Sequence, residues 1–221
     1  MSTNLKNGLF FLCLYLACLT CIAIDFDRLQ IAIVQKFGMN SLPNFTAWKG
    51  MMSAANALDS DGKLKRVNEF FNRRIGWGDD LTLWGMSDYW ATPMDTLGKG
   101  AGDCEDFAIA KYFTLINLGL PVESLRLVYV KIKSNVLDNE DVGKAHMVLA
   151  YYKTPDSDPL ILDNQITDIK PASRRKDLTP IFSFNSEGNF LSINGSNESV
   201  NRASLSRWQD LLKRSMQEGF N

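Results

Sequence analysis

The chain has 221 residues and a formal net charge of −1, with 24 Lys and Arg side chains against 25 Asp and Glu. This length is enough for one sizeable domain, with two lobes around one cleft. The even charge balance, and the lack of a basic run that could follow phosphates, argue against a nucleic-acid-binding protein.

Residues 1–23 predict a secretory signal peptide. MSTNLKN carries one lysine and no acidic residue, and the apolar run GLFFLCLYLACLTCIAI follows it. Cys21, Ile22 and Ala23 fit the small-x-small pattern, so we expect cleavage after Ala23 and export of the rest. A retained membrane anchor is an alternative, because about 17 apolar residues are at the lower limit for a span. A lipoprotein site at Cys18 or Cys21 is another.

Residues 24–221 predict a single domain of the α+β class. Its helical part, about residues 25–118, repeatedly places apolar residues three and four apart. Asp59–Gly62 is typical of a turn between two of the helices. The first three helices are expected at residues 26–38, 46–58 and 63–75.

Gly76–Gly100 predicts a long irregular link that is rich in tryptophan and glycine. Trp77, Trp84 and Trp90 have two interpretations. They cover an edge of the core, as large aromatic side chains often do, or they line a groove next to the cysteine that follows.

A central helix is expected from Asp103 to about Leu118, because Gly119 ends it. Its apolar spacing predicts one buried face. An antiparallel sheet, about residues 119–200, and a final helix at about 203–218 complete the domain. The expected strands are residues 124–132, 145–153, 159–165 and 181–185, with a hairpin turn at TPDSD.

Cys104 and His146 are the only cysteine and the only histidine left once the signal peptide is removed. A lone thiol in an exported protein is either buried and inert or used. We expect Asp103 to cap the central helix, with Asp106 completing a capping box. Cys104 would then be the first helical residue, where the helix dipole favours a thiolate and free N–H groups can bind an oxyanion.

His146 and Asp163 supply a candidate base and orienting group. Pairing across the TPDSD turn places residue 146 opposite about residue 166, so that Asp163 is a near-diagonal neighbour that a bulge could bring closer. The predicted triad is Cys104 as nucleophile, His146 as base and Asp163 as the residue that orients the ring. A satisfied structural histidine and an aspartate that opens a turn are the alternative interpretations.

The segments WATPMDTLGKGAGDCEDFAIAKYFTL, HMVLAYY and LILDNQ resemble the bacterial transglutaminase-like cysteine proteinases. The resemblance implies a papain/transglutaminase-like fold and a periplasmic cysteine endopeptidase with Cys104, His146 and Asp163 as its triad. It implies a giant cell-surface adhesin as substrate, cut next to a di-alanine so that a biofilm cell is freed. It also implies inhibition by an inner-membrane cyclic di-GMP receptor of the LapD type.

The same resemblance implies a calcium ion bound by acidic residues that flank the cysteine. Asp103, Glu105 and Asp106 are hard oxygen ligands of the kind that Ca²⁺ requires. Without a cation their charge would raise the pKa of the Cys104 thiol and keep it protonated. Successive helical residues point about 100° apart, so one helix face cannot hold all three. A solvated acidic helix start is the alternative.

Two other functions remain open from the sequence. The same triad serves a cell-wall amidase, a peptidoglycan endopeptidase or a transglutaminase on this fold. A non-catalytic, calcium-binding exported module, in which Cys104 is structural, is a further alternative.

Overall fold

The computed structural model describes residues 24–133, 143–188, 191–193 and 198–220. The predicted signal peptide lies outside these residues. Among the helices of the described ranges, none combines the length and the apolar character needed to cross a membrane.

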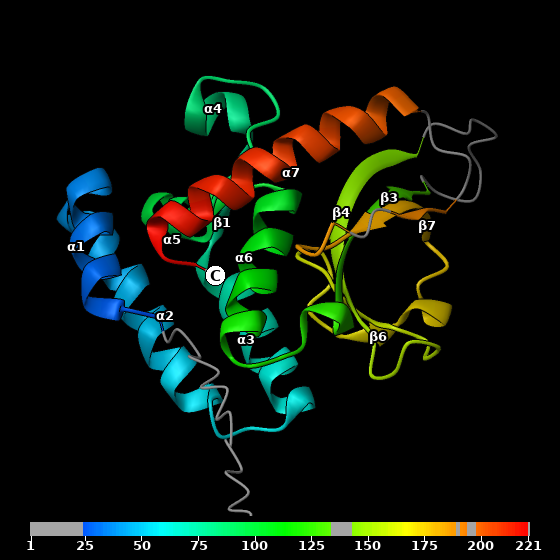
Figure 1. Cartoon of the computed structure of the whole chain (residues 1–221), viewed down its shortest axis with the longest axis horizontal. Coiled ribbons are helices and arrows are strands. Elements are labelled where there is room, and N and C mark those ends of the chain that lie inside the picture. The colour runs from blue at the N-terminus through cyan, green and yellow to red at the C-terminus, as the bar shows by residue number, and fades with distance from the viewer. Residues whose placement is uncertain (1–23, 134–142, 189–190, 194–197, 221) are drawn as a thin grey trace, which may run out of the picture.

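The helix that carries Cys104 lies at the centre of the molecule (Figure 1). This helix, α6 (Cys104–Asn117), packs against α3 and α5 on one side and against strands β3 and β4 on the other. The remaining α-helices are α1 (Phe26–Phe37), α2 (Leu42–Ala55), α3 (Ser60–Arg74), α4 (Asp80–Trp84), α5 (Pro93–Lys99) and α7 (Glu198–Glu218). Short 3₁₀ helices are η1 (Met39–Ser41), η2 (Val122–Ser124) and η3 (Ala172–Arg174).

A six-stranded antiparallel sheet forms the second layer, in the order β6-β5-β4-β3-β7-β8. Its strands are β3 (Leu125–Ile132), β4 (Lys144–Tyr151), β5 (Leu160–Leu162), β6 (Lys170–Pro171), β7 (Leu178–Phe184) and β8 (Leu191–Ser192). A separate parallel pair joins β1 (Gly76–Trp77) to β2 (Ala101–Gly102). The predicted α+β class, with the cysteine helix packed on an antiparallel sheet, is confirmed.

Two predictions about the helical part were wrong. Asp59 caps α3, accepting the N–H of Gly62 at 2.9 Å, so the predicted turn is the first turn of this helix. The link 76–100 is not irregular throughout, because it contains α4 and α5. Thr92 and Asp95 form a capping box that starts α5, with Pro93 at its first position.

Helix α6 is buried on more than the one face that its apolar spacing predicts. Every residue from Asp106 to Leu115 is buried, because helices cover one side of α6 and the sheet covers the other. Lys111 is among them, with only 1% of its surface exposed. A buried lysine is costly unless it has a charge partner, and Asp163 is the partner that supports its charge.

Helix α7 starts at Glu198, earlier than predicted, and crosses the ends of α6 and the sheet (Figure 1). Trp208 anchors it by donating its ring N–H to the Asn185 carbonyl at 3.1 Å. Arg207 forms an ion pair with Asp88, in the loop after α4. These contacts fix α7 beside the N-terminal end of α6.

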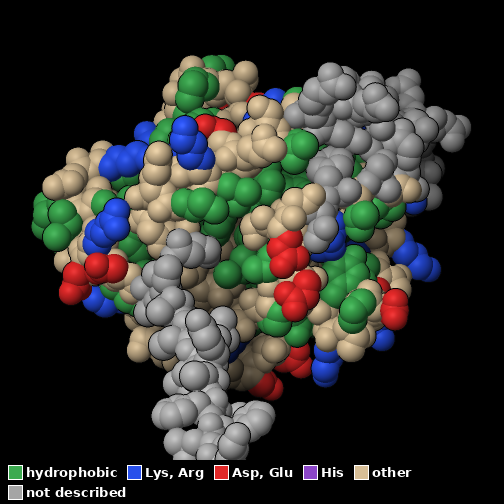
Figure 2. Space-filling model, viewed as in Figure 1, with side chains coloured by type: hydrophobic (Ala, Val, Ile, Leu, Met, Phe, Trp, Pro, Cys, Tyr) green, Lys and Arg blue, Asp and Glu red, His purple; other side chains and the backbone are tan. Residues whose placement is uncertain are grey.

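On the face that Figure 2 shows, Lys and Arg side chains lie scattered among acidic and hydrophobic ones. The described residues of this face therefore offer no continuous basic track for a phosphate backbone.

Candidate active site

An open cleft of about 650 Å³ lies where the N-terminus of α6 meets the start of β4. Cys104 and His146 both line it. The walls come from α4 and its flanking loops, β3, the segment after β5, and α7. Residues far apart in the sequence thus converge on one cavity that can admit a peptide.

Cys104 is the first residue of α6, as predicted. The Asp106 carboxylate accepts the backbone N–H of Asp103 at 3.3 Å, which is the returning half of the predicted capping box. Oδ1 of Asp103, by contrast, is buried without a hydrogen-bond partner. The sulfur therefore lies at the positive end of the helix dipole, next to an incompletely satisfied carboxylate.

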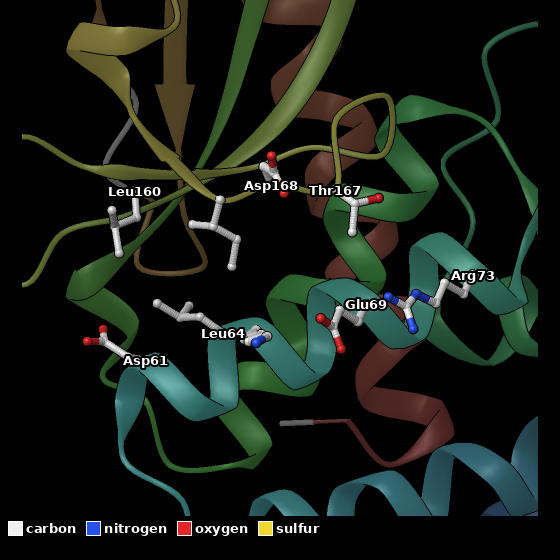
Figure 3. Close-up of a pocket in the computed structure, with 9 residues that line it drawn as sticks. Asp61, Leu64, Glu69, Arg73, Leu160, Thr167 and Asp168 are labelled. Carbon is white, nitrogen blue, oxygen red and sulfur yellow. The ribbon is translucent and has the colours of Figure 1, made fainter.

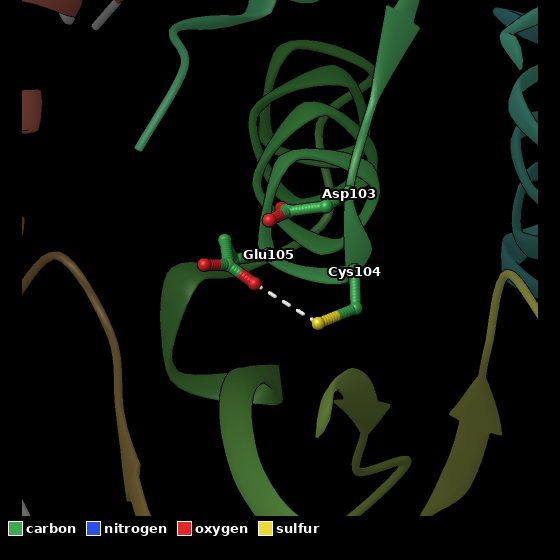
Figure 4. A group of neighbouring side chains, drawn as sticks. All are labelled: Asp103, Cys104 and Glu105. Carbon is green, nitrogen blue, oxygen red and sulfur yellow. Dashed lines mark hydrogen bonds between the residues drawn. The ribbon is translucent and has the colours of Figure 1, made fainter. Parts of the chain in front are cut away.

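The thiol of Cys104 donates a hydrogen bond to Oε2 of Glu105 at 2.9 Å (Figure 4). Burial raises the pKa of this thiol, and the charge of Glu105 raises it further. The backbone N–H of Met147 acts in the opposite direction by bonding the sulfur. This last contact places the sulfur beside the residue that follows His146.

His146 and Asp163 are both buried, and Nε2 of the imidazole lies 2.9 Å from Oδ1 of the carboxylate. In the neutral ring, a proton on Nε2 leaves Nδ1 as the unprotonated nitrogen. The β4–β5 pairing aligns Leu149 with Leu162, one residue away from the predicted register. Continuing it places Asp163 opposite Val148 and diagonal to His146, and the pairing is regular, without the bulge that the sequence allowed.

Asp163 has hydrogen-bond donors on both carboxylate oxygens. Oδ1 also accepts the backbone N–H of Gln165 at 2.9 Å, and Oδ2 accepts Nη2 of Arg175 at 2.8 Å. Burial alone would raise the pKa of Asp163, but these bonds, that from His146 above all, lower it to about 2. Arg175 was missed from the sequence, since nothing in SRRKD distinguishes it from its neighbours.

Asp80 is a second residue that sequence reasoning missed. Its carboxylate lies with those of Asp103 and Asp106, each contributing an oxygen within 4.8 Å of the others. Burial, with the nearby acidic charges, raises the pKa of Asp80 to about 6, although the N–H of Tyr89 opposes this by donating to it. Oδ1 of Asp80 is buried and unpartnered.

The predicted calcium ligands divide between two neighbouring groups. Glu105 groups with Asp103 and the Cys104 sulfur, whereas Asp106 groups with Asp103 and Asp80. Both oxygens of Asp106 already accept backbone N–H groups, from Ala91 at 2.8 Å and from Asp103. Clustered carboxylates with unpartnered buried oxygens fit a hard cation such as Ca²⁺.

Trp90 fits both interpretations of the tryptophans. It belongs to the core, only 4% exposed and stacked on Phe184 at 5.7 Å, and it also lines the cleft. Trp77 is 69% exposed at the lip of the cleft, and β1 pairs it with Gly102. Trp84 lies outside the cleft wall and packs on Tyr89.

A second groove, of about 540 Å³, lies between α3 and the segment around β5 (Figure 3). Its walls carry both signs of charge, with Asp61, Glu69 and Asp168 beside Lys65 and Arg73. None of its lining residues is a cysteine or a histidine. The cleft at Cys104 is therefore the stronger candidate for chemistry.

A family model described as bacterial transglutaminase-like cysteine proteinase matches residues 47–177. Among solved structures, Legionella pneumophila LapG is similar at 35% identity and a TM-score of 0.70, covering 87% of this chain and 98% of that one. Its EGTA-treated form gives the same values. Its calcium-bound form gives 36% identity and a TM-score of 0.69, covering 86% and 99%. No curated protein matched the sequence. The expected transglutaminase-like fold is confirmed by these likenesses.

Proposed function

The chain belongs to the bacterial transglutaminase-like cysteine proteinases, and we propose that it is a calcium-dependent periplasmic cysteine endopeptidase that cuts a large cell-surface adhesin near a di-alanine. The observation that carries the proposal is the cleft itself. It holds the described chain's free thiol, Cys104, together with the histidine that is bonded to a buried aspartate. Trp77 offers an exposed apolar side chain at its lip.

In the proposed reaction, Nδ1 of His146 takes the thiol proton of Cys104 as the sulfur attacks the scissile carbonyl. The free N–H groups at the start of α6 stabilise the oxyanion. The imidazolium then protonates the leaving amine, and water activated by the neutral ring hydrolyses the thioester. Asp163 keeps the ring in the tautomer with the proton on Nε2 and stabilises the imidazolium.

Asp80, Asp103 and Glu105 are the residues that would hold calcium, with Asp106 supporting the backbone around them. Support comes from the calcium-bound form of the Legionella protein and from the two acidic groups that share Asp103. A bound divalent cation supplies positive charge that offsets these carboxylates. Glu105 would then hold the thiol proton of Cys104 less strongly, which favours its transfer to His146.

The cellular context of the proposal follows from the family resemblance. The predicted signal peptide, residues 1–23, would deliver the enzyme to the periplasm. Its substrate would be a large surface adhesin whose cleavage releases biofilm cells. An inner-membrane cyclic di-GMP receptor of the LapD type would restrain it by binding.

Incubation of the purified protein with an N-terminal adhesin fragment that contains a di-alanine tests this function. We expect one cut beside the di-alanine in calcium, and none in excess EGTA or with Cys104→Ala. Circular dichroism should show that EGTA leaves the fold intact. Full activity in EGTA would refute the calcium requirement.

A parallel incubation with purified cell wall separates the alternative reactions. Release of wall peptides without adhesin cleavage would identify an amidase or peptidoglycan endopeptidase. Cleavage that persists with Cys104→Ala would exclude a thiol mechanism.

A further inference from the structure

Arg175 lies directly behind the His146–Asp163 pair. It follows η3, is only 4% exposed, and donates Nη2 to Oδ2 of Asp163 at 2.8 Å. We propose that Arg175 is a positioning residue, which acts through Asp163 to fix the tautomer and orientation of His146. The inference rests on the proposed roles of Cys104 and His146.

The geometry leaves the Asp163 carboxylate one arrangement that satisfies its partners. Oδ1 faces Nε2 of His146 and the Gln165 N–H, while Oδ2 faces Arg175. Donors on both oxygens prevent rotation of the carboxylate plane. His146 is therefore oriented by the Asp163 carboxylate, which Arg175 holds in place through its other oxygen.

Asp177 holds Arg175 in turn. Its Oδ1 accepts Nε of Arg175 at 3.0 Å, and its Oδ2 accepts Nη2 at 2.7 Å. A guanidinium presents its donors in a rigid planar fork, so this pairing orients the whole group. Asp177 is 40% exposed, so a hydrogen-bonded chain runs from the ring of His146 to the protein surface.

Arg175 has a second role, as a counter-charge for the buried carboxylate of Asp163. Asp163 is 1% exposed, and when His146 is neutral a buried carboxylate needs another cation nearby. Lys111 is the other basic group that interacts with it, but burial lowers the pKa of Lys111 to about 7. Arg175 keeps its charge at all physiological pH values, so it supplies the permanent counter-charge.

Three variants test the inference: Arg175→Gln, Arg175→Lys and, as a matched control, Arg174→Gln at the exposed neighbouring position. Because the chain contains one histidine, ¹⁵N NMR of the untagged protein reports the tautomer of His146 directly. Iodoacetamide labelling of Cys104 in calcium, followed by mass spectrometry at that residue, measures how well the thiol is activated.

We expect Arg174→Gln to match the wild type, with the proton of the neutral ring on Nε2. Arg175→Gln should give a tautomer mixture and slow the labelling on the order of 100-fold, a loss that misplacing a reacting group by about 1 Å can produce. Arg175→Lys keeps the charge without the fork, so it should recover part of the rate.

Wild-type tautomer and labelling in folded Arg175→Gln would overturn the inference. If that variant does not fold, wild-type values in Arg175→Lys overturn it instead. Neither readout uses an adhesin. Failure of the proposed substrate therefore leaves this test intact, and unchanged values in the Arg175 variants would leave the proteolysis proposal standing.

Discussion

The two walls of the cleft differ in how well their charges are balanced. On the sheet side, His146 lines the cleft, with Asp163 and Arg175 behind it; both oxygens of the Asp163 carboxylate have donors, and its pKa is lowered to about 2. On the helix side, formed by Asp80, Asp103, Cys104 and Glu105, buried oxygens lack partners. Burial and like charge raise the pKa values of Asp80 and Asp103.

This difference separates two tasks of the proposed enzyme. The sheet side is organised by protein groups alone, so the base can be oriented before any ligand arrives. The helix side gathers negative charge that its own groups do not neutralise, beside a thiol that must lose a proton. The calcium dependence that we propose would therefore act at the nucleophile and not at the base.

The largest expected effect comes from breaking the sheet side. Asp163→Asn should lower kcat for peptide cleavage by up to about 10⁴-fold, because the amide no longer selects the Nε2–H tautomer of His146. Calcium affinity, measured by isothermal titration calorimetry, should remain that of the wild type, since the helix side is untouched.

Asp168→Asn is the control for that substitution, because it makes the same chemical change at an exposed position of the same connecting segment. Thermal unfolding must show that Asp163→Asn is folded, since the change weakens a partner of buried Arg175. A kcat within a fewfold of wild type in the folded variant would remove Asp163 from the mechanism.

Asp80→Asn should produce a smaller effect, confined to the helix side. We expect calcium affinity to fall by at least about tenfold, because the charge of the ligand set decreases. In EGTA the variant should unfold at a higher temperature than wild type, since a penalised buried charge is gone. In saturating calcium the wild type should instead unfold at the higher temperature.

Asp156→Asn, in the exposed turn between β4 and β5 and outside the cleft wall, serves as the control for Asp80→Asn. Unchanged calcium affinity would show that Asp80 is not a ligand. A changed tautomer of His146 would show that the two sides are not independent, which would contradict the comparison itself.

The sequence predicted the parts of this arrangement that depend on local pattern. Helix α6 and its Asp106 cap, and the hairpin that brings His146 near Asp163, follow from spacing over at most about 20 residues. Asp80 comes from the start of α4 and Arg175 from the segment after η3, and no local pattern marks a residue whose partner is fixed only by the fold. Helix α5 was missed although Thr92, Pro93 and Asp95 carry its start signal, because the surrounding tryptophans and glycines suggested a loop.

Substitution of Lys111 is expected to have the smallest effect on cleavage. It also tests which residues belong to the sheet side and which to the helix side. It belongs to the cysteine helix, yet the charge it faces is Asp163. Its pKa is about 7 in the folded protein and 10.5 without burial, so the unfolded chain holds more protons between these values. Wild-type stability should therefore rise with pH across this window, and the cost of the buried charge is greatest below it.

Lys111→Met removes that cost and keeps an unbranched side chain, which is one atom shorter. We expect the free energy of unfolding to increase by about 1 kcal/mol or more below pH 7, with the gain fading as the pH approaches 10.5. Denaturant titrations at several pH values measure this, with exposed Lys153→Met as the control. Cleavage should change little, because Arg175 still pairs with Asp163. Loss of cleavage as severe as in Asp163→Asn would instead make Lys111 part of the sheet side, because its charge would then be needed to hold the base.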